Sequence, residues 1–190
     1  MAATIAVVYD ACVLYPAPLR DLLVQLATTG IFRAKWTDLI HDEWTRNLLI
    51  KRPDLNTDRL TRLRVLMNQN VPDSLVVDFE DLIPTLELPD PDDRHVLAAA
   101  IIAEAKIIVT FNLKDFPESI LVRYGITAQH PDLFIADTIE RYPQQVLQAI
   151  ETILVRLKNP PQTFDRHLET LANQGLPISV ALLRDLHREG

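Results

Sequence analysis

Cysteine and glycine are scarce in this 190-residue sequence, and both shortages restrict its chemistry. The single cysteine, Cys12, cannot form an internal disulfide, which favours a reducing compartment. The four glycines form neither G-x-x-x-x-G-K-[ST] nor G-x-G-x-x-G, so a glycine-rich loop that cradles phosphates is nearly excluded. The five histidines show no ligand spacing, so a zinc site is disfavoured.

Positive charge and long apolar runs are also in short supply. There are 19 basic residues against 26 acidic ones, so a basic coat that binds nucleic acid nonspecifically is not expected. An acidic site loaded with divalent ions can still attract phosphate. No apolar run approaches the roughly 20 residues that span a bilayer, and the N-terminus lacks the pattern of a signal peptide. We therefore expect a cytoplasmic protein with no membrane partner.

Short apolar runs alternate with stretches of helical spacing. This alternation predicts an α/β fold, with a parallel sheet wrapped by helices. Strands are predicted at residues 4–9, 74–79, 106–111 and 126–129, and helices at residues 19–27, 37–50, 57–67, 93–105, 115–124, 131–141, 143–158, 163–173 and 179–187. We expect two parts, an α/β domain at 1–142 and a helical C-terminal extension at 143–190, with a hinge at Pro160 and Pro161.

Three acids crowd the segment P-D-P-D-D-R-H-V-L, directly ahead of an apolar run. Like charges this close repel, and a helix start benefits from one capping carboxylate. Helical spacing places Asp93 on the buried face with Val96 and Leu97, while Asp92 points away as a solvated cap. Asp90 can reach inward from the loop. A bound cation would explain the crowding, and simple N-capping by Asp93 is the alternative.

Glu43 falls in the middle of the apolar face of the helix predicted at 37–50, together with Asn47. Burial of an unpaired carboxylate costs roughly several kcal/mol, so Glu43 needs a partner. A functional role and a structural ion pair are both open.

Polar side chains also follow two predicted strands. Asp10 comes directly after the first strand, and Thr110, Asn112 and Asp115 follow the strand K-I-I-V-T-F. Each can be explained as a turn or cap residue. Ligands of open parallel sheets bind outside these strand ends, so Asp10, Asp93 and the 110–115 loop could share one crevice. Several carboxylates in one crevice need compensation, and oxygen-rich sites suit Mg²⁺ or Mn²⁺.

Four motifs in order resemble the PIN domain, and in particular the VapC-type toxins of prokaryotic toxin and antitoxin pairs. They are V-V-Y-D-A-C-V-L at the first strand end, D-E-W at 42–44, D-P-D-D-R-H-V-L-A-A-A at 90–100 and I-V-T-F-N-L-K-D-F-P at 108–117. The resemblance covers roughly residues 4 to 135. It implies a three-layer α/β/α fold and a metal-dependent endoribonuclease, with RNA as substrate, an antitoxin protein as partner and a homodimer.

Carried across by position, the acids of the family correspond to Asp10, Glu43 and Asp93, with Thr110 as the adjacent hydroxyl. Asn112 departs from the pattern, because many members have Asp there. Asp115 could substitute, or the site could hold one metal ion instead of two, with Asp90, Asn112 or Asp115 completing the ligand shell.

Four basic residues are candidates for contacts with the RNA backbone. They are Lys114 and the charged side of the helix predicted at 57–67, Arg59, Arg62 and Arg64. A charged helix face is more often simply solvated.

Two other functions compete with a ribonuclease. One is a phosphoryl-transfer protein with Asp10 as nucleophile, but a haloacid-dehalogenase-type phosphatase would need an Asp where Cys12 stands. A response-regulator receiver also fits poorly. The other is a non-catalytic PIN-like binding protein whose acids bind a metal ion or an Arg of another protein, and Asn112 keeps it open.

Overall fold

A parallel sheet of four strands forms the centre of the computed structural model, which describes residues 4–189. The strands lie in the order β2-β1-β3-β4, with bounds β1 (Ala6–Tyr9), β2 (Arg33–Lys35), β3 (Ile107–Val109) and β4 (Thr127–Gln129). Val7 of β1 pairs with Ala34 on one side and with Ile107 on the other. The predicted α/β class with a parallel sheet is confirmed.

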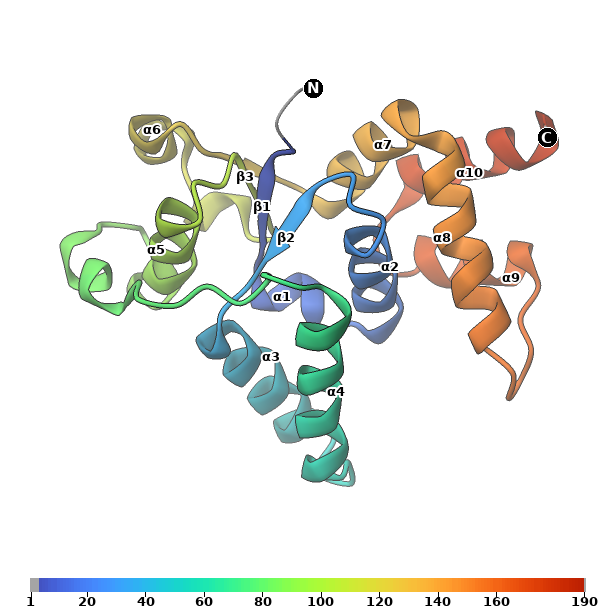
Figure 1. Ribbon diagram of the computed structural model, residues 1–190, viewed down its shortest axis with the longest axis horizontal. Coiled ribbons are helices and arrows are strands. Elements are labelled where there is room, and N and C mark those ends of the chain that lie inside the picture. Colours follow the sequence, from blue (N-terminus) through green and yellow to red (C-terminus); the bar gives the residue numbers. More distant parts are fainter. Residues whose placement is uncertain (1–3, 190) are drawn as a thin grey trace.

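Helices cover both faces of the sheet, which gives the three-layer α/β/α arrangement that the resemblance implied (Figure 1). The helix α5 packs against β1 and β3 on one side, and α2 and α7 lie on the other. The α-helices are α1 (Ala11–Leu14), α2 (Ala17–Ala27), α3 (Asp38–Lys51), α4 (Thr57–Asn70), α5 (Arg94–Ile102), α6 (Glu118–Leu121), α7 (Pro131–Arg141), α8 (Pro143–Arg156), α9 (Phe164–Ala172) and α10 (Pro177–Glu189). Short 3₁₀ turns are η1 (Glu80–Thr85), η2 (Pro91–Asp93), η3 (Leu113–Asp115) and η4 (Val122–Tyr124).

The central strands form because their residues are apolar and covered on both faces. Every residue of β1 is buried, as expected for a parallel strand between two helical layers. Two predictions for the sheet were wrong. The edge strand β2 reads R-A-K and escaped notice because it lacks an apolar run. The segment 74–79 is not a strand, since only Leu75 bridges to Trp36 and both Asp73 and Asp78 have positive φ angles.

Several helix boundaries also differ from the predictions by one to three residues, and one predicted helix is broken. The helix predicted at 93–105 begins one residue later, at Arg94, and ends at Ile102. The helix predicted at 115–124 is instead the series η3, α6 and η4, which Pro117 interrupts and Gly125 ends in the left-handed conformation. The break predicted at Pro160 and Pro161 falls in the loop between α8 and α9.

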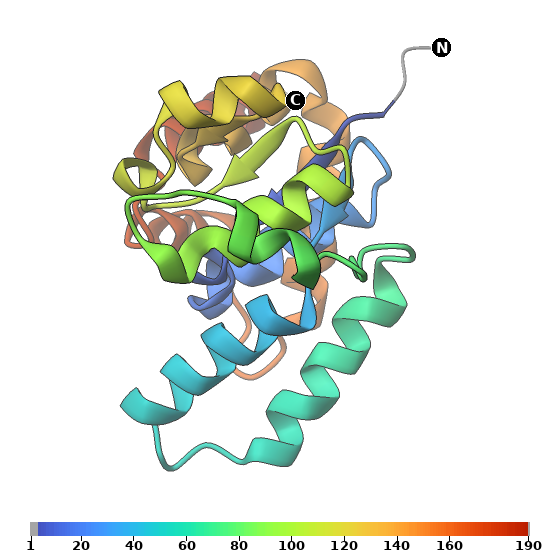
Figure 2. The same ribbon diagram turned by 90° about the vertical axis from the view of Figure 1, so that its left-hand side faces the viewer.

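The helices α3 and α4 form a hairpin that projects from the body of the molecule (Figures 1 and 2). A buried polar network anchors this hairpin. Trp36 Nε1 donates to Asn68 Oδ1 (2.7 Å), His41 Nε2 lies 3.2 Å from the same oxygen, and Trp44 Nε1 donates to His41 Nδ1 (3.0 Å). Because Nδ1 of His41 is an acceptor, Nε2 must be its donor. This network fixes the orientation of α3, which carries Glu43 and Lys51.

The C-terminal helices pack around the α2 and α7 layer, with α8 against α2 and α10 against α7 (Figure 1). Their buried side chains, such as Ile150, Leu168 and Leu183, belong to the same apolar cluster as the strands. The division of the chain at residue 142 stays a prediction. No helix in the described part of the chain is long and apolar enough to cross a bilayer.

Candidate active site at the carboxyl ends of the strands

The ends of β1 and β3 bring the side chains of Thr110 and Cys12 to that of Asp10. Asp10 is 2% exposed, and its backbone N–H donates to the carbonyl of Val109, so the two strand ends stay in register. Thr110 Oγ1 donates to Asp10 Oδ2 (2.6 Å), and Cys12 Sγ donates to the same oxygen (3.1 Å). The side chain of Asp10 does not cap α1. A residue that only forms a turn would use its carboxylate to cap the short helix that follows. The Asp10 carboxylate instead accepts hydrogen bonds from Thr110 and Cys12, which argues against a role as a simple turn former.

The three acids of segment 90–93 lie in different environments. Asp90 accepts a hydrogen bond from Asp92 N (2.9 Å) and thus caps η2, while Asp92 is exposed. Asp93 is buried at the start of α5, and its side chain does not cap the helix. The capping expected of Asp92 or Asp93 therefore belongs to Asp90, because the 3₁₀ turn moves the cap three residues toward the N-terminus.

Asp93 lies in the field of the other acids. Burial, followed in decreasing order by the charges of Asp10, Asp90, Asp115 and Glu43, raises the pKa of Asp93 to about 7. Burial also raises the pKa of Asp10, and the charge of Glu43 adds to that shift, while the hydrogen bonds from Thr110 and Cys12 oppose it. The structure therefore brings the predicted acids to one crevice at the carboxyl ends of the strands.

Glu43 reaches this crevice from α3 and meets a partner on α5. His95 Nε2 lies 3.2 Å from Glu43 Oε2, and the two side chains are 13% and 30% exposed. Nδ1 of His95 is buried without a hydrogen-bond partner in the described structure. The partner that the position of Glu43 required is thus His95, and the contact joins α3 to the helix that carries Asp93.

A cavity of about 370 Å³ lies beside Glu43 along α3. Its lining includes Glu43, Asn47 and Lys51 of α3, together with Tyr15 and Asn112. Asn112 is exposed, and its backbone N–H donates to Thr110 Oγ1 (2.9 Å), which ties the Asn112 loop to the hydroxyl that aligns Asp10.

The donor chemistry of the crevice fits Mg²⁺ or Mn²⁺, since its candidate ligands are carboxylate and amide oxygens. A dication between these carboxylates would offset the repulsion that helps to raise the pKa of Asp93. Among residues 4–189, no three His, Cys, Asp or Glu side chains stand in an arrangement that could hold a metal ion. The acids share the crevice without forming a ready-made ligand cage, so binding of a metal ion would have to draw them together.

Comparison with known proteins identifies the chain. A family model of the PIN domain matches residues 6–114, which is more than half of the sequence. The chain belongs to the PIN domain family. A model of the VapC50 C-terminal domain matches residues 131–185. These matches confirm the resemblance to VapC-type proteins.

One curated relative extends this comparison. The putative ribonuclease VapC50 of Mycobacterium tuberculosis is 40% identical over 98 residues, which cover 52% of this chain and 57% of the relative. The match therefore spans little more than half of the relative's length. No solved structure matches the chain.

Within this PIN domain, the predicted RNA-contacting side chains lie in different surroundings. Arg59 and Arg62 are exposed on α4 and line none of the cavities described here, and Lys114 is exposed on the turn after Asn112. Arg64 already pairs with Asp42 (2.6 Å) and with Asp38 (3.2 Å). Contacts of Arg59, Arg62 and Lys114 with RNA stay a prediction.

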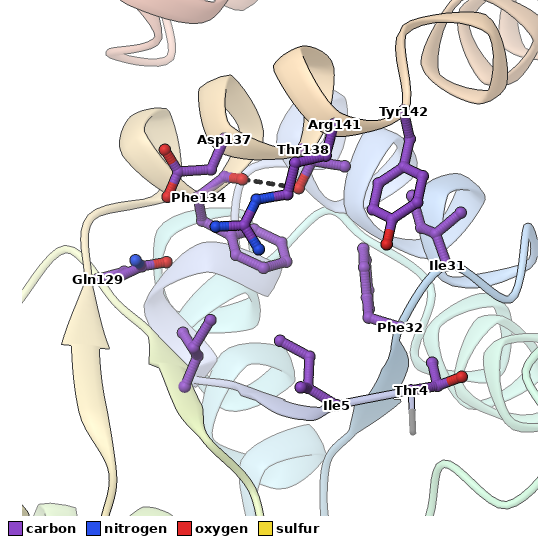
Figure 3. A pocket seen from close by; sticks show the side chains of 11 residues that line it. Thr4, Ile5, Ile31, Phe32, Gln129, Phe134, Asp137, Thr138, Arg141 and Tyr142 are labelled. Atoms are coloured by element: carbon purple, nitrogen blue, oxygen red, sulfur yellow. Dashed lines mark hydrogen bonds between the residues drawn. The ribbon is translucent and has the colours of Figure 1, made fainter. Parts of the chain in front are cut away.

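A second cavity lies beneath α7, on the face of the sheet that α7 covers (Figure 3). It measures about 290 Å³, and Phe134 and Arg141 of α7 face it. Oε1 of Gln129, which also lines it, is buried without a hydrogen-bond partner from the described residues. None of the predicted site residues lines this cavity.

Sequence reasoning missed four side chains of the crevice and of the cavity beside it: Cys12, Tyr15, Lys51 and His95. Lys51 could have been found, because Glu43 and Asn47 lie on the helix predicted at 37–50 and Lys51 follows at the same four-residue interval, directly after the predicted end. Nothing in the sequence pairs Cys12 with Thr110 or His95 with Glu43, since these contacts join elements far apart in the chain.

Proposed function

We propose that the protein is a metal-dependent endoribonuclease that hydrolyses RNA phosphodiester bonds. The observation that carries this proposal is Asp93, a buried carboxyl with a pKa raised to about 7 by burial and by surrounding acids. Structural acids acquire donors or counterions, whereas acids crowded in a crevice are typical of sites that await a cation. The curated relative, which is named a putative ribonuclease, supports RNA as the substrate class.

The residues of the crevice have distinct proposed roles. Asp10, Glu43 and Asp93 would hold Mg²⁺ or Mn²⁺, with Asp90, Asn112 and Asp115 as further candidates. When bound, the ion would lower the pKa of a water molecule and stabilise charge on the phosphoryl oxygens. Thr110 and Cys12 both donate to Oδ2 of Asp10, and would therefore orient its carboxylate. His95 would hold Glu43 in the same way across α3 and α5.

Partners follow from the family. We propose that the protein is the toxin of a toxin–antitoxin pair, with an antitoxin protein as partner and a homodimer as its assembly. The match of residues 131–185 to the VapC50 C-terminal domain supports the assignment to VapC-type proteins.

Incubation with varied RNAs, with and without chelator, tests the proposed activity. Wild-type protein should cleave in Mg²⁺ or Mn²⁺ and stop cleaving in EDTA, and the Asp93→Asn variant should be inactive. Lys106→Gln is the matched control, because Lys106 is exposed at the opposite end of the sheet. Binding of RNA without cleavage would favour the non-catalytic binding protein, and an acyl phosphate on Asp10 would favour phosphoryl transfer.

A further inference from the structure

The cavity beside the acids has one wall that continues from the proposed metal ligands. Glu43, Asn47 and Lys51 are spaced at four-residue intervals on α3, so their side chains follow one face of the helix, and all three line the cavity. Glu43 faces the acids, while Lys51 lies two turns away. A carboxylate, an amide and an ammonium group thus succeed one another along the path that leads out of the crevice.

Tyr15, at the end of α1, adds an aromatic ring to the cavity lining beside the ammonium group. Lys51 Nζ lies 5.4 Å from the centroid of the Tyr15 ring, within the range of a cation–π contact. The backbone beneath Tyr15 is anchored by the buried Arg20, which donates from Nη1 to the carbonyl of Leu14 (2.8 Å) and to that of Tyr15 (3.4 Å). Arg20 is 6% exposed and lies over the Trp44 ring of α3. The ring of Tyr15 is therefore carried by a rigid support that is also connected to α3.

We propose that this cavity is a subsite for the nucleotide next to the scissile phosphodiester of RNA. Lys51 contacts the phosphate, Tyr15 packs against the base and holds the ammonium group in place, and Asn47 hydrogen-bonds the base edge. This inference rests on the proposed ribonuclease function.

The chemistry of the lining selects single-stranded RNA. Proteins bind single strands with a cation that contacts the backbone and an aromatic side chain that packs against a base, and an amide can both donate to and accept from a base edge. Lys51 is the basic residue among the described residues of this lining, and it stands at the end far from the acids. Phosphate is therefore attracted to the end of the cavity at Lys51, while the end at Glu43 attracts a cation.

The closing experiment measures binding of a short fluorescent single-stranded RNA by fluorescence anisotropy. The full chain carries Asp93→Asn, and EDTA is present, so that the RNA is not cleaved and one repelling carboxylate is removed. Adding Lys51→Gln should weaken binding about tenfold, the loss of one charge-assisted contact. It should also reduce the slope of log K against log salt by about 0.7, the value for one phosphate contact on a single strand. Lys106→Gln removes the same charge elsewhere and should change affinity by less than about twofold.

Cleavage measurements on chains with intact acids separate the subsite from the activity itself. In the otherwise wild-type chain, Lys51→Gln should raise KM about tenfold and leave kcat within about threefold. Asn47→Ala and Tyr15→Leu should change which nucleotides flank the cut in a randomised RNA pool. Equal affinity and salt slope for Lys51→Gln and Lys106→Gln, or no RNA binding at all, would overturn the subsite. Binding that depends on Lys51 without any cleavage would retain the cavity as a nucleotide-binding site and overturn the ribonuclease instead.

Discussion

Two buried aspartates, Asp93 and Asp132, start from the same chemistry and end in opposite environments. Asp132 on α7 is 3% exposed and accepts hydrogen bonds from Ile178 N (2.9 Å), Ser179 N (2.8 Å) and Ser179 Oγ (2.7 Å). It thereby supplies acceptors to the first turn of α10. Asp93 is 9% exposed, its carboxylate accepts no hydrogen bond from residues 4–189, and the charges of four other acids act on it.

The difference shows how burial of the same residue type can serve the fold or a ligand. A carboxylate that receives several donors offsets its desolvation within the protein, and it joins two helices. A carboxylate that faces other acids is destabilised in the charged form until a cation arrives. Asp132 therefore holds the C-terminal helices, and Asp93 is available for metal binding.

Exchange of each aspartate for asparagine should give the largest contrast in activity. Asp93→Asn should lower RNA cleavage by about 1000-fold, because the crevice loses the acid on which the charges of all the others act. Asp132→Asn should leave the activity per folded molecule within about twofold, since Asp132 lies outside the crevice. Steady-state cleavage at saturating Mg²⁺, corrected for the folded fraction by circular dichroism, measures both. Similar losses in the two variants would remove the distinction.

Stability should respond in the reverse order. Asp132→Ala leaves two backbone N–H groups without their acceptor and leaves the Ser179 hydroxyl with only the backbone carbonyl of residue 132, so it should lower the free energy of unfolding by about 2 to 4 kcal/mol. Urea unfolding followed by circular dichroism measures the change. Asp93→Ala is the matched control and should cost less, because no donor loses its partner. A larger loss for Asp93→Ala would contradict the assignment of Asp132 to the fold.

The metal-free protein should lose stability as the pH rises. The pKa of Asp93 is about 7 in the folded chain and near 3.8 when unfolded, so the folded state binds the proton more tightly. Its contribution is therefore fully present below pH 4 and is lost as the pH rises through 7. In EDTA, Asp93→Asn should remove this loss and gain roughly 1 to 3 kcal/mol over wild type at pH 8 relative to pH 4. Parallel pH profiles of unfolding for the two chains would contradict this expectation.

Removal of a single hydroxyl in each region should give the smallest effects. Ser179→Ala should cost about 1 kcal/mol of stability and leave cleavage unchanged, because its hydroxyl donates only to Asp132. Thr110→Val should lower cleavage about tenfold with little change in stability, since the Thr110 hydroxyl aligns Asp10 and accepts from Asn112 N. Thermal unfolding and cleavage rates measured on the same samples test the pair. Equal cleavage losses would show that neither hydroxyl is specific to the crevice.

The sequence predicts the crevice better than it predicts the surroundings. Alternating strands and helices place Asp10 and Thr110 at adjacent strand ends, and helical spacing turns Asp93 inward, because both follow from local patterns. The strand β2 is short and polar, so no apolar run identifies it. The contacts of Glu43 with His95 and of Lys51 with Tyr15 join separate elements, and local patterns do not encode them.

Thermal unfolding of wild type and Asp93→Asn in a Mg²⁺ titration at pH 8 tests the central claim most directly. If a dication relieves the repulsion among the crevice acids, Mg²⁺ should raise the Tm of the wild-type chain progressively as its concentration passes the Kd. The Tm of Asp93→Asn should rise by much less. An equal rise in both chains, or no rise in the wild type, would contradict a metal site built around Asp93.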